Sequence, residues 1–263
     1  MHNFISIKNN EKNMLDILKI LFCTPFLLYS CYSDIKTRRV TNKLWLIMLA
    51  MGSVFVVYDL WNYGFSYLFP IFRSSILTFI FVYILFQLGV FGGADAKSLI
   101  VLSIIFPVYP DFSGFPIHDP LSIFRDYFAF GIFENAVVLT IVVPLCLVFY
   151  NLSKMGLHID KPLYAFIGYK TKISELSEKR HIKLIEGFKK INNGIKFYFK
   201  RGGVEIDEEV IIELKNASEK GLIKDDVWVT PGLPFMIPIT LGFFVAVIYG
   251  NLIFELTKYI LFH

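Results

Sequence analysis

The chain has 263 residues, of which 55% are hydrophobic and 18% are charged. A soluble domain usually carries about a quarter charged residues, and the mean hydropathy here is +0.57. The apolar residues form long runs, which argues against a secreted or cytosolic globule, and the formal net charge of +4 is small for a nucleic-acid-binding protein. Three cysteines without a CxxC spacing argue against a disulfide framework and against a zinc site. The composition indicates an integral membrane protein.

Six apolar segments predict membrane-spanning helices, because a hydrocarbon core of about 30 Å requires roughly 20 apolar residues. The expected spans are 15–33, 43–61, 68–91, 94–109, 132–152 and 233–257, the fourth being short. We expect an α-helical membrane protein with a polar extension at 1–14 and five helices within 15–152. A soluble insertion at 153–230 and a sixth helix within 231–263 would follow. Met14 is a candidate start.

The distribution of basic residues predicts the orientation in the membrane. The link between the first two spans carries Lys36, Arg38, Arg39 and Lys43, whereas residues 62–67 contain no Lys or Arg. This places the 34–43 link, the 92–95 turn and the 153–230 segment on the cytoplasmic side, with both termini outside.

The 153–230 segment has mixed charge and reads as a small α+β insertion. Apolar residues in Ile173–Ile191 recur near helical spacing, whereas residues 195–200 alternate like a strand and precede an Arg201-Gly-Gly turn signal. The excess of basic residues in this segment is expected for a cytoplasmic connection of a membrane protein. Binding of these residues to anionic lipid is a weaker alternative explanation.

Two acidic residues stand at predicted helix ends on the cytoplasmic side. Asp34 ends the first span, and Asp95 follows the third in Gly92-Gly93-Ala94-Asp95. Two carboxylates in a poorly hydrated cleft share a proton, so one can activate water while the other protonates a carbonyl oxygen. Equally, Asp95 could be only a helix N-cap and Asp34 an ordinary interface residue. Asp59 and Glu134 are expected to be interfacial rather than catalytic.

Both segments resemble the motifs of a protease family. Gly92-Gly93-Ala94-Asp95 resembles the Gly-x-Gly-Asp motif of membrane aspartyl proteases, which include prepilin peptidases, archaeal preflagellin peptidases and presenilins. Asp34-Ile-Lys-x-Arg-x-Val-x-Asn, which ends at Asn42, is similar to the other signature of prepilin and preflagellin peptidases. The segment from Trp228 into the last span also resembles the preflagellin peptidases. Ala94 departs from the motif, which has a second glycine there.

The resemblance implies a peptidase that removes the basic leader from archaellin or pilin-like precursors at the cytoplasmic face of an archaeal cell membrane. It implies Asp34 and Asp95 as catalytic residues and neither metal nor cofactor. The two CxxC pairs of the bifunctional bacterial enzymes are absent, so we expect cleavage without N-methylation. The resemblance also implies substrate-binding or motif-supporting roles for seven further residues: Gly92, Gly93, Ala94, Lys36, Asn42, Pro231 and Pro234.

Two other functions remain open at this point. A small cation-coupled transporter could use Asp34 and Asp95 as ion ligands, although such ligands usually lie near the membrane midplane and broken helices recur in symmetric halves. A catalytically silent scaffold for pilus assembly is the second. Membrane lipid is an expected partner and nucleic acid is not; the oligomeric state and the preferred precursor are left undetermined by the sequence.

Overall fold

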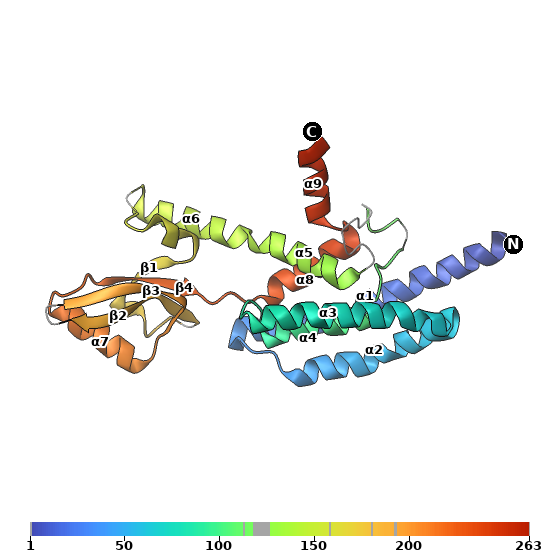
Figure 1. Cartoon of the computed structure of the whole chain (residues 1–263), viewed down its shortest axis with the longest axis horizontal. Helices are drawn as coiled ribbons and strands as arrows, with labels where there is room; N and C mark the ends of the chain where they lie inside the picture. Colours follow the sequence, from blue (N-terminus) through green and yellow to red (C-terminus); the bar gives the residue numbers. More distant parts are fainter. Residues whose placement is uncertain are drawn as a thin grey trace. The chain divides into compact units, whose positions relative to one another are not determined.

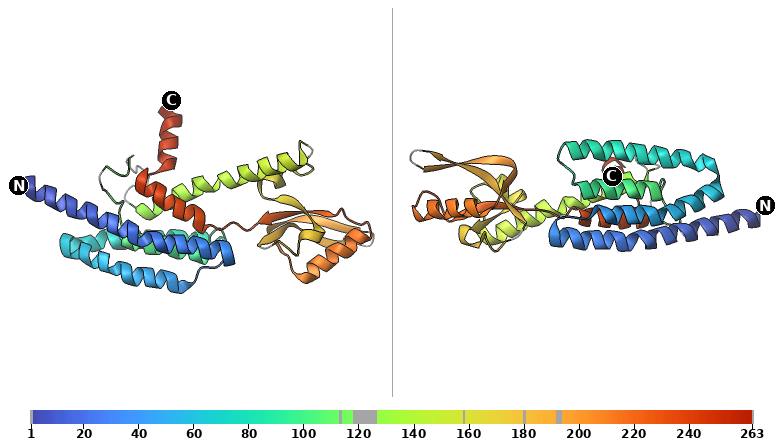
Figure 2. Two further views of the ribbon diagram at one scale, coloured as in Figure 1. Left: turned by 180° about the vertical axis from the view of Figure 1, so that it is seen from behind. Right: turned by 90° about the horizontal axis from the view of Figure 1, so that it is seen from below.

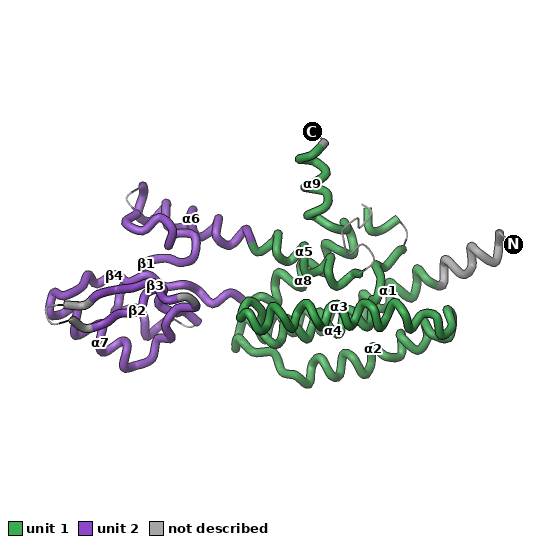
Figure 3. Tube along the Cα trace, viewed as in Figure 1, with its two compact units in different colours: residues 1–140, 234–263 green, residues 141–233 purple. Residues whose placement is uncertain are grey.

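The chain folds into two compact units, which are described separately (Figure 3). The structure is a computed structural model that describes residues 2–112, 114–117, 127–157, 159–179, 181–191 and 194–262. The first unit comprises residues 1–140 and 234–263, and the second comprises residues 141–233.

The first unit is helical. Its helices are α1 (His2–Thr37), α2 (Asn42–Tyr63), η1 (Phe65–Tyr67), α3 (Leu68–Gln87), α4 (Gly93–Ile105), α5 (Phe128–Thr140), α8 (Met236–Ile248) and α9 (Leu252–Phe262). Figures 1 and 2 show α1 to α4 lying side by side, and α4 packs against both α2 and α3. Helix α8 returns to the unit late in the chain and packs against α5 and α1.

Within the described residues, four helical segments are long and apolar enough to cross a membrane: Lys12–Thr37, Asn42–Tyr63, Phe65–Gln87 and Phe128–Met155. Helices α8 and α9 make a fifth only as a pair bent by 66°. Helix α4 has 13 residues, about 20 Å of length, which is less than a hydrocarbon core. The helical membrane architecture is therefore confirmed, whereas six full-length spans are not.

The core of this unit depends on a very close approach of α5 and α8. A Cβ atom added to Gly242 would lie 2.5 Å from the backbone oxygen of Ile132 and 2.9 Å from the backbone nitrogen of Ala136. Only glycine permits this approach, as in close helix pairs of other membrane proteins. The side chains of Phe106, Phe128 and Phe243 fill the space around it and are fully buried.

The second unit is a sheet with helices. Its elements are α6 (Val142–Met155), η2 (Pro162–Phe166), β1 (Tyr169–Lys172), η3 (Ile173–Glu175), β2 (Ile182–Ile191), β3 (Gly194–Glu205), α7 (Glu208–Glu219) and β4 (Asp226–Pro231). The strands pair antiparallel in the order β1-β4-β2-β3. A helix packed with a small sheet agrees with the α+β composition expected of this region.

Two local predictions within this unit are wrong and one is confirmed. Residues 173–191 form a short 3-10 turn and strand β2 instead of a helix. The strand expected at 195–200 is present, but β3 continues through the glycines where a turn was expected. Gly202 and Gly203 have φ values of 85° and 73°, and they lie opposite a register shift in β2 between Leu184 and Glu186. The two glycines therefore accommodate a β-bulge-like irregularity in the pairing of β2 with β3.

Candidate active site

Asp34 lies one turn before the end of α1 and accepts a hydrogen bond from the start of α8. The backbone N–H of Met236 donates to its Oδ2 at 3.2 Å. Three residues earlier on α1, the Cys31 sulfur lies 3.1 Å from the Thr240 hydroxyl and 3.3 Å from the Met236 carbonyl oxygen. The half-buried Asp34 carboxylate is thus held at the N-terminus of α8, where unpaired N–H groups favour negative charge.

Asp95 is the third residue of α4 and is only 7% exposed. Its Oδ2 accepts a hydrogen bond of 3.0 Å from the Gly92 N–H, which precedes the helix. A Cβ at position 92 would lie 2.9 Å from that oxygen. Since the φ of Gly92 is −77°, the glycine is required for the space that it leaves to the carboxylate and not for a left-handed backbone.

The start of α8 connects the two carboxylate positions. The ring of Phe235, which precedes α8, packs on the ring of Phe91 with centroids 5.1 Å apart, and Phe91 directly precedes the glycine-alanine motif. Met236, next to Phe235, binds Asp34. The adjacent residues Phe235 and Met236 therefore contact both Asp34 and the residue that precedes the motif of Asp95. The fold therefore brings together two acidic residues that are 61 positions apart in the printed sequence.

A second contact joins the two sequence motifs. Lys97 donates a hydrogen bond of 2.6 Å from its Nζ to the Oδ1 of Asn42, the first residue of α2. Lys97 received no role from the sequence, although it lies two residues after Asp95. Lys36 is exposed and contacts Tyr32 on its own helix. Pro231 ends β4 in the second unit, and Pro234 opens the final segment of the first.

Asp59 is buried and paired with a basic residue of the same unit. Its side chain is 3% exposed, and its Oδ2 lies 2.6 Å from the Nζ of Lys19 on α1. Lys19 also approaches Asp16 at 3.7 Å, and Asp16 accepts a hydrogen bond from the Asp111 N–H. A lysine inside an apolar run is itself a signal of a buried partner, and that signal was available in the sequence. Glu134 is half-buried and accepts a hydrogen bond from Asn251.

Among the residues that the structure describes, no group of three or more His, Cys, Asp or Glu side chains is arranged to hold a metal ion. The two acidic side chains and the surrounding backbone N–H groups are the reactive groups that the site offers. Carboxylates can exchange protons with water and with a carbonyl oxygen.

Two family models match the chain. The model described as the type IV leader peptidase family matches residues 21–149, and the archaeal peptidase A24 C-terminus type II matches residues 160–252. The chain belongs to the type IV leader peptidase family. Both Asp34 and Asp95 lie within the part matched by the first of these models.

Several proteins that are named preflagellin peptidase resemble this leader peptidase family member along most of its length. The protein from Methanococcus voltae is 28% identical over 240 residues, which cover 88% of this chain and 94% of that protein. The protein from Methanocaldococcus jannaschii is 26% identical over 241 residues, which cover 86% and 91% respectively. The protein from Methanococcus maripaludis (strain C6) is 25% identical over 240 residues, which cover 87% and 94%.

Proposed function

We propose that this membrane protein is an aspartic endopeptidase that removes the basic leader peptide from archaellin precursors at the cytoplasmic face of the membrane. The observation that carries the proposal is that the start of α8 contacts both Asp34 and Phe91, which precedes the motif of Asp95, with both acidic residues inside the region matched by the leader peptidase model. Related proteins that carry the name preflagellin peptidase supply the substrate class. None of these matches supports the alternative of a cation transporter.

The hydrogen bonds at the two carboxylates suit a proton-shuttling pair. In the described part of the chain, each carboxylate accepts one backbone N–H, from Met236 at Asp34 and from Gly92 at Asp95. Each therefore keeps an oxygen atom for water or for a peptide carbonyl. The backbone donors fix the orientation of both groups without neutralising their charge, which is the preorganisation that catalysis requires.

The proposed reaction is hydrolysis without a covalent intermediate. One carboxylate takes a proton from water as the water oxygen bonds to the carbonyl carbon of the scissile peptide, and the other, protonated, carboxyl donates its proton to the carbonyl oxygen. The tetrahedral intermediate then collapses, the carbon–nitrogen bond breaks, and a proton from the pair goes to the leaving amine. The two groups titrate jointly, so the role of base belongs to the pair and not to one residue.

The charge distribution supports a cytoplasmic site. Asp34 is followed within ten residues by four basic residues: Lys36, Arg38, Arg39 and Lys43. Positively charged connections remain on the cytoplasmic side of a membrane protein. A precursor whose basic leader is held on that side and whose next segment is an apolar helix would present its cleavage point at the membrane boundary, which is where the proposal puts the two carboxylates.

The decisive experiment compares asparagine substitutions at three helix-capping aspartates. Asparagine caps a helix about as well as aspartate does but cannot shuttle a proton. Asp34→Asn and Asp95→Asn should therefore each abolish cleavage of an archaellin precursor in isolated membranes while the protein remains folded. Asp207, whose carboxylate caps α7 by accepting the Val210 N–H at 2.8 Å, provides the matched control, and Asp207→Asn should cleave normally.

Two results would contradict the proposal. Normal cleavage by either Asp34→Asn or Asp95→Asn would reduce that residue to a helix cap. Absence of cleavage by the unmodified protein with every archaellin and pilin-like precursor offered would favour the silent scaffold. Mapping the cleaved bond by mass spectrometry distinguishes leader removal from other proteolysis.

A further inference from the structure

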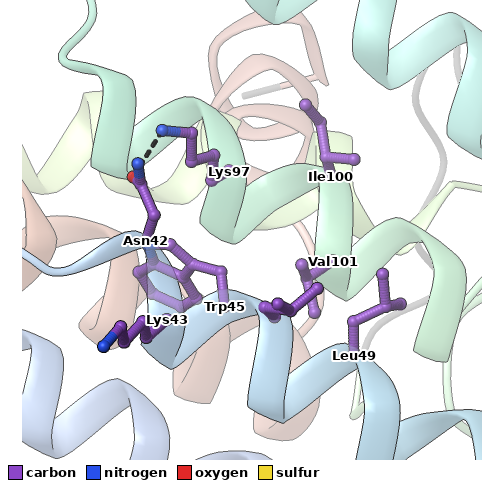
Figure 4. Close-up of a pocket in the computed structure, with 8 residues that line it drawn as sticks. Asn42, Lys43, Trp45, Leu49, Lys97, Ile100 and Val101 are labelled. Atoms are coloured by element: carbon purple, nitrogen blue, oxygen red, sulfur yellow. Dashed lines mark hydrogen bonds between the residues drawn. The ribbon is translucent and has the colours of Figure 1, made fainter.

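A groove between α2 and α4 shares Asn42 and Lys97 with the contact that joins the two motifs, and contains neither Asp34 nor Asp95 among its lining residues. Its cavity volume is about 410 Å³, which is within the usual range of about 300–1,000 Å³ for ligand pockets. Figure 4 shows the side chains from the two helices facing this space, with the Lys97–Asn42 hydrogen bond at one end. The residues that line it are Asn42, Lys43, Trp45, Leu46, Leu49, Lys97, Ile100 and Val101.

The groove is polar at one end and apolar along its length. On α2 the lining positions Asn42, Trp45, Leu46 and Leu49 recur at three- and four-residue spacing, which is one face of the helix, and Ile100 and Val101 follow Lys97 by three and four residues on α4. Both lysines lie in the first two turns of their helices, whereas Leu49 and Val101 are further along. An apolar groove with the Lys97 ammonium at one end and Lys43 on its flank matches a molecule with an anionic head and a hydrocarbon chain.

Neither lysine has an acidic partner among the described residues. In the part of the chain that the structure describes, no carboxylate forms an ion pair with Lys43 or Lys97. The hydrogen bond to Asn42 occupies one of the three N–H groups of Lys97 and leaves its charge uncompensated. Basic pockets between membrane helices on the cytoplasmic side attract anionic lipid head groups.

We propose that this groove binds one anionic phospholipid, with the phosphate at Lys97, further positive charge from Lys43 on the flank of the groove, and a hydrocarbon chain along Leu46, Leu49 and Ile100. The lipid would bridge α2 and α4 next to Asp95. The apolar segment of a precursor is the competing occupant, but its leader is basic, and the two lysines of the groove repel it. Charge complementarity therefore selects the lipid.

The test uses Trp45, which lines the groove and is one of three tryptophans in the chain. In a protein carrying Trp61→Phe and Trp228→Phe, the remaining tryptophan reports on its surroundings. Phosphatidylglycerol with brominated chains should quench its fluorescence in detergent at lower concentration than brominated phosphatidylcholine does. Each lysine near a membrane surface contributes about fivefold in affinity for anionic lipid, so Lys43→Gln with Lys97→Gln should remove most of the selectivity, about 30-fold.

The matched control is Arg39→Gln, which removes an exposed basic residue of the same connection that does not line the groove. It should retain the selectivity. Native mass spectrometry of the unmodified protein provides a second measurement, in which phosphatidylglycerol is retained and the double lysine variant loses it. Equal quenching by the two lipids, or selectivity that survives the double substitution, would overturn the proposal. Relief of quenching by a precursor peptide, without lipid selectivity, would assign the groove to the substrate and would also overturn it.

Discussion

Gly92→Ala should impair catalysis while leaving the protein folded. The added Cβ would lie 2.9 Å from the Asp95 Oδ2, so the oxygen must move by about 0.5 Å to reach the 3.4 Å of ordinary contact. A misplacement of 1 Å can cost about 100-fold in rate, and we therefore expect a loss of about tenfold or more. Because the obstructed atom is at the end of a side chain, the free energy of unfolding should fall by no more than about 1 kcal/mol.

Gly93→Ala is the matched control, because the adjacent glycine has open space around it. An added Cβ there meets nothing closer than 3.9 Å, so this variant should cleave normally and be slightly more stable as a helix. The assay compares initial rates of precursor cleavage and thermal unfolding in the same detergent. Equal rates for the two alanine variants, or unfolding of Gly92→Ala alone, would refute the view that this glycine makes room for the carboxylate.

Three further outcomes are expected. Lys19→Met should lower the free energy of unfolding by about 3–5 kcal/mol because it leaves Asp59 buried without its partner. The double variant Lys19→Met with Asp59→Leu should recover much of this loss, measured by thermal unfolding. If it recovers nothing, the pairing of Lys19 with Asp59 is contradicted. Gly242→Ala should greatly reduce the folded yield, measured by size-exclusion chromatography, because its Cβ meets the α5 backbone at 2.5 Å; a normal yield would contradict this close approach. In a cysteine-free background, Lys36→Cys should react with a membrane-impermeant thiol reagent only from the cytoplasm and Ser66→Cys only from outside; labelling of both from one side would refute the orientation.

The sequence by itself determined the helical membrane class and the two acidic motifs. Long apolar runs require helices in a bilayer because the backbone has no other partner there, so hydropathy alone located most spans. It could not show that the final apolar segment bends by 66° between α8 and α9. It also could not show that α4 stops at Ile105. The bend between α8 and α9 and the end of α4 both depend on how neighbouring helices pack.

Strand β2 shows why the spacing of apolar residues wrongly predicted a helix in the second unit. Leu184 packs with Val229 on one face of the sheet, whereas its neighbour Ile185 packs with Trp228 in a separate cluster. Two adjacent buried residues are typical of a helix stripe, but they arise here because both faces of the strand are covered. Pairing with β3 and β4 decides the conformation, and those partners are distant in the chain.

The partners of the charged groups were decided only by the tertiary structure. Asp34 binds the N–H of Met236, 202 residues away, and Lys19 binds Asp59, 40 residues away. The sequence can place a carboxylate at a helix end, because the helix and its end are local. Which helix start lies against it depends on how the helices pack, and close approaches such as that at Gly242 fix this packing across the whole chain.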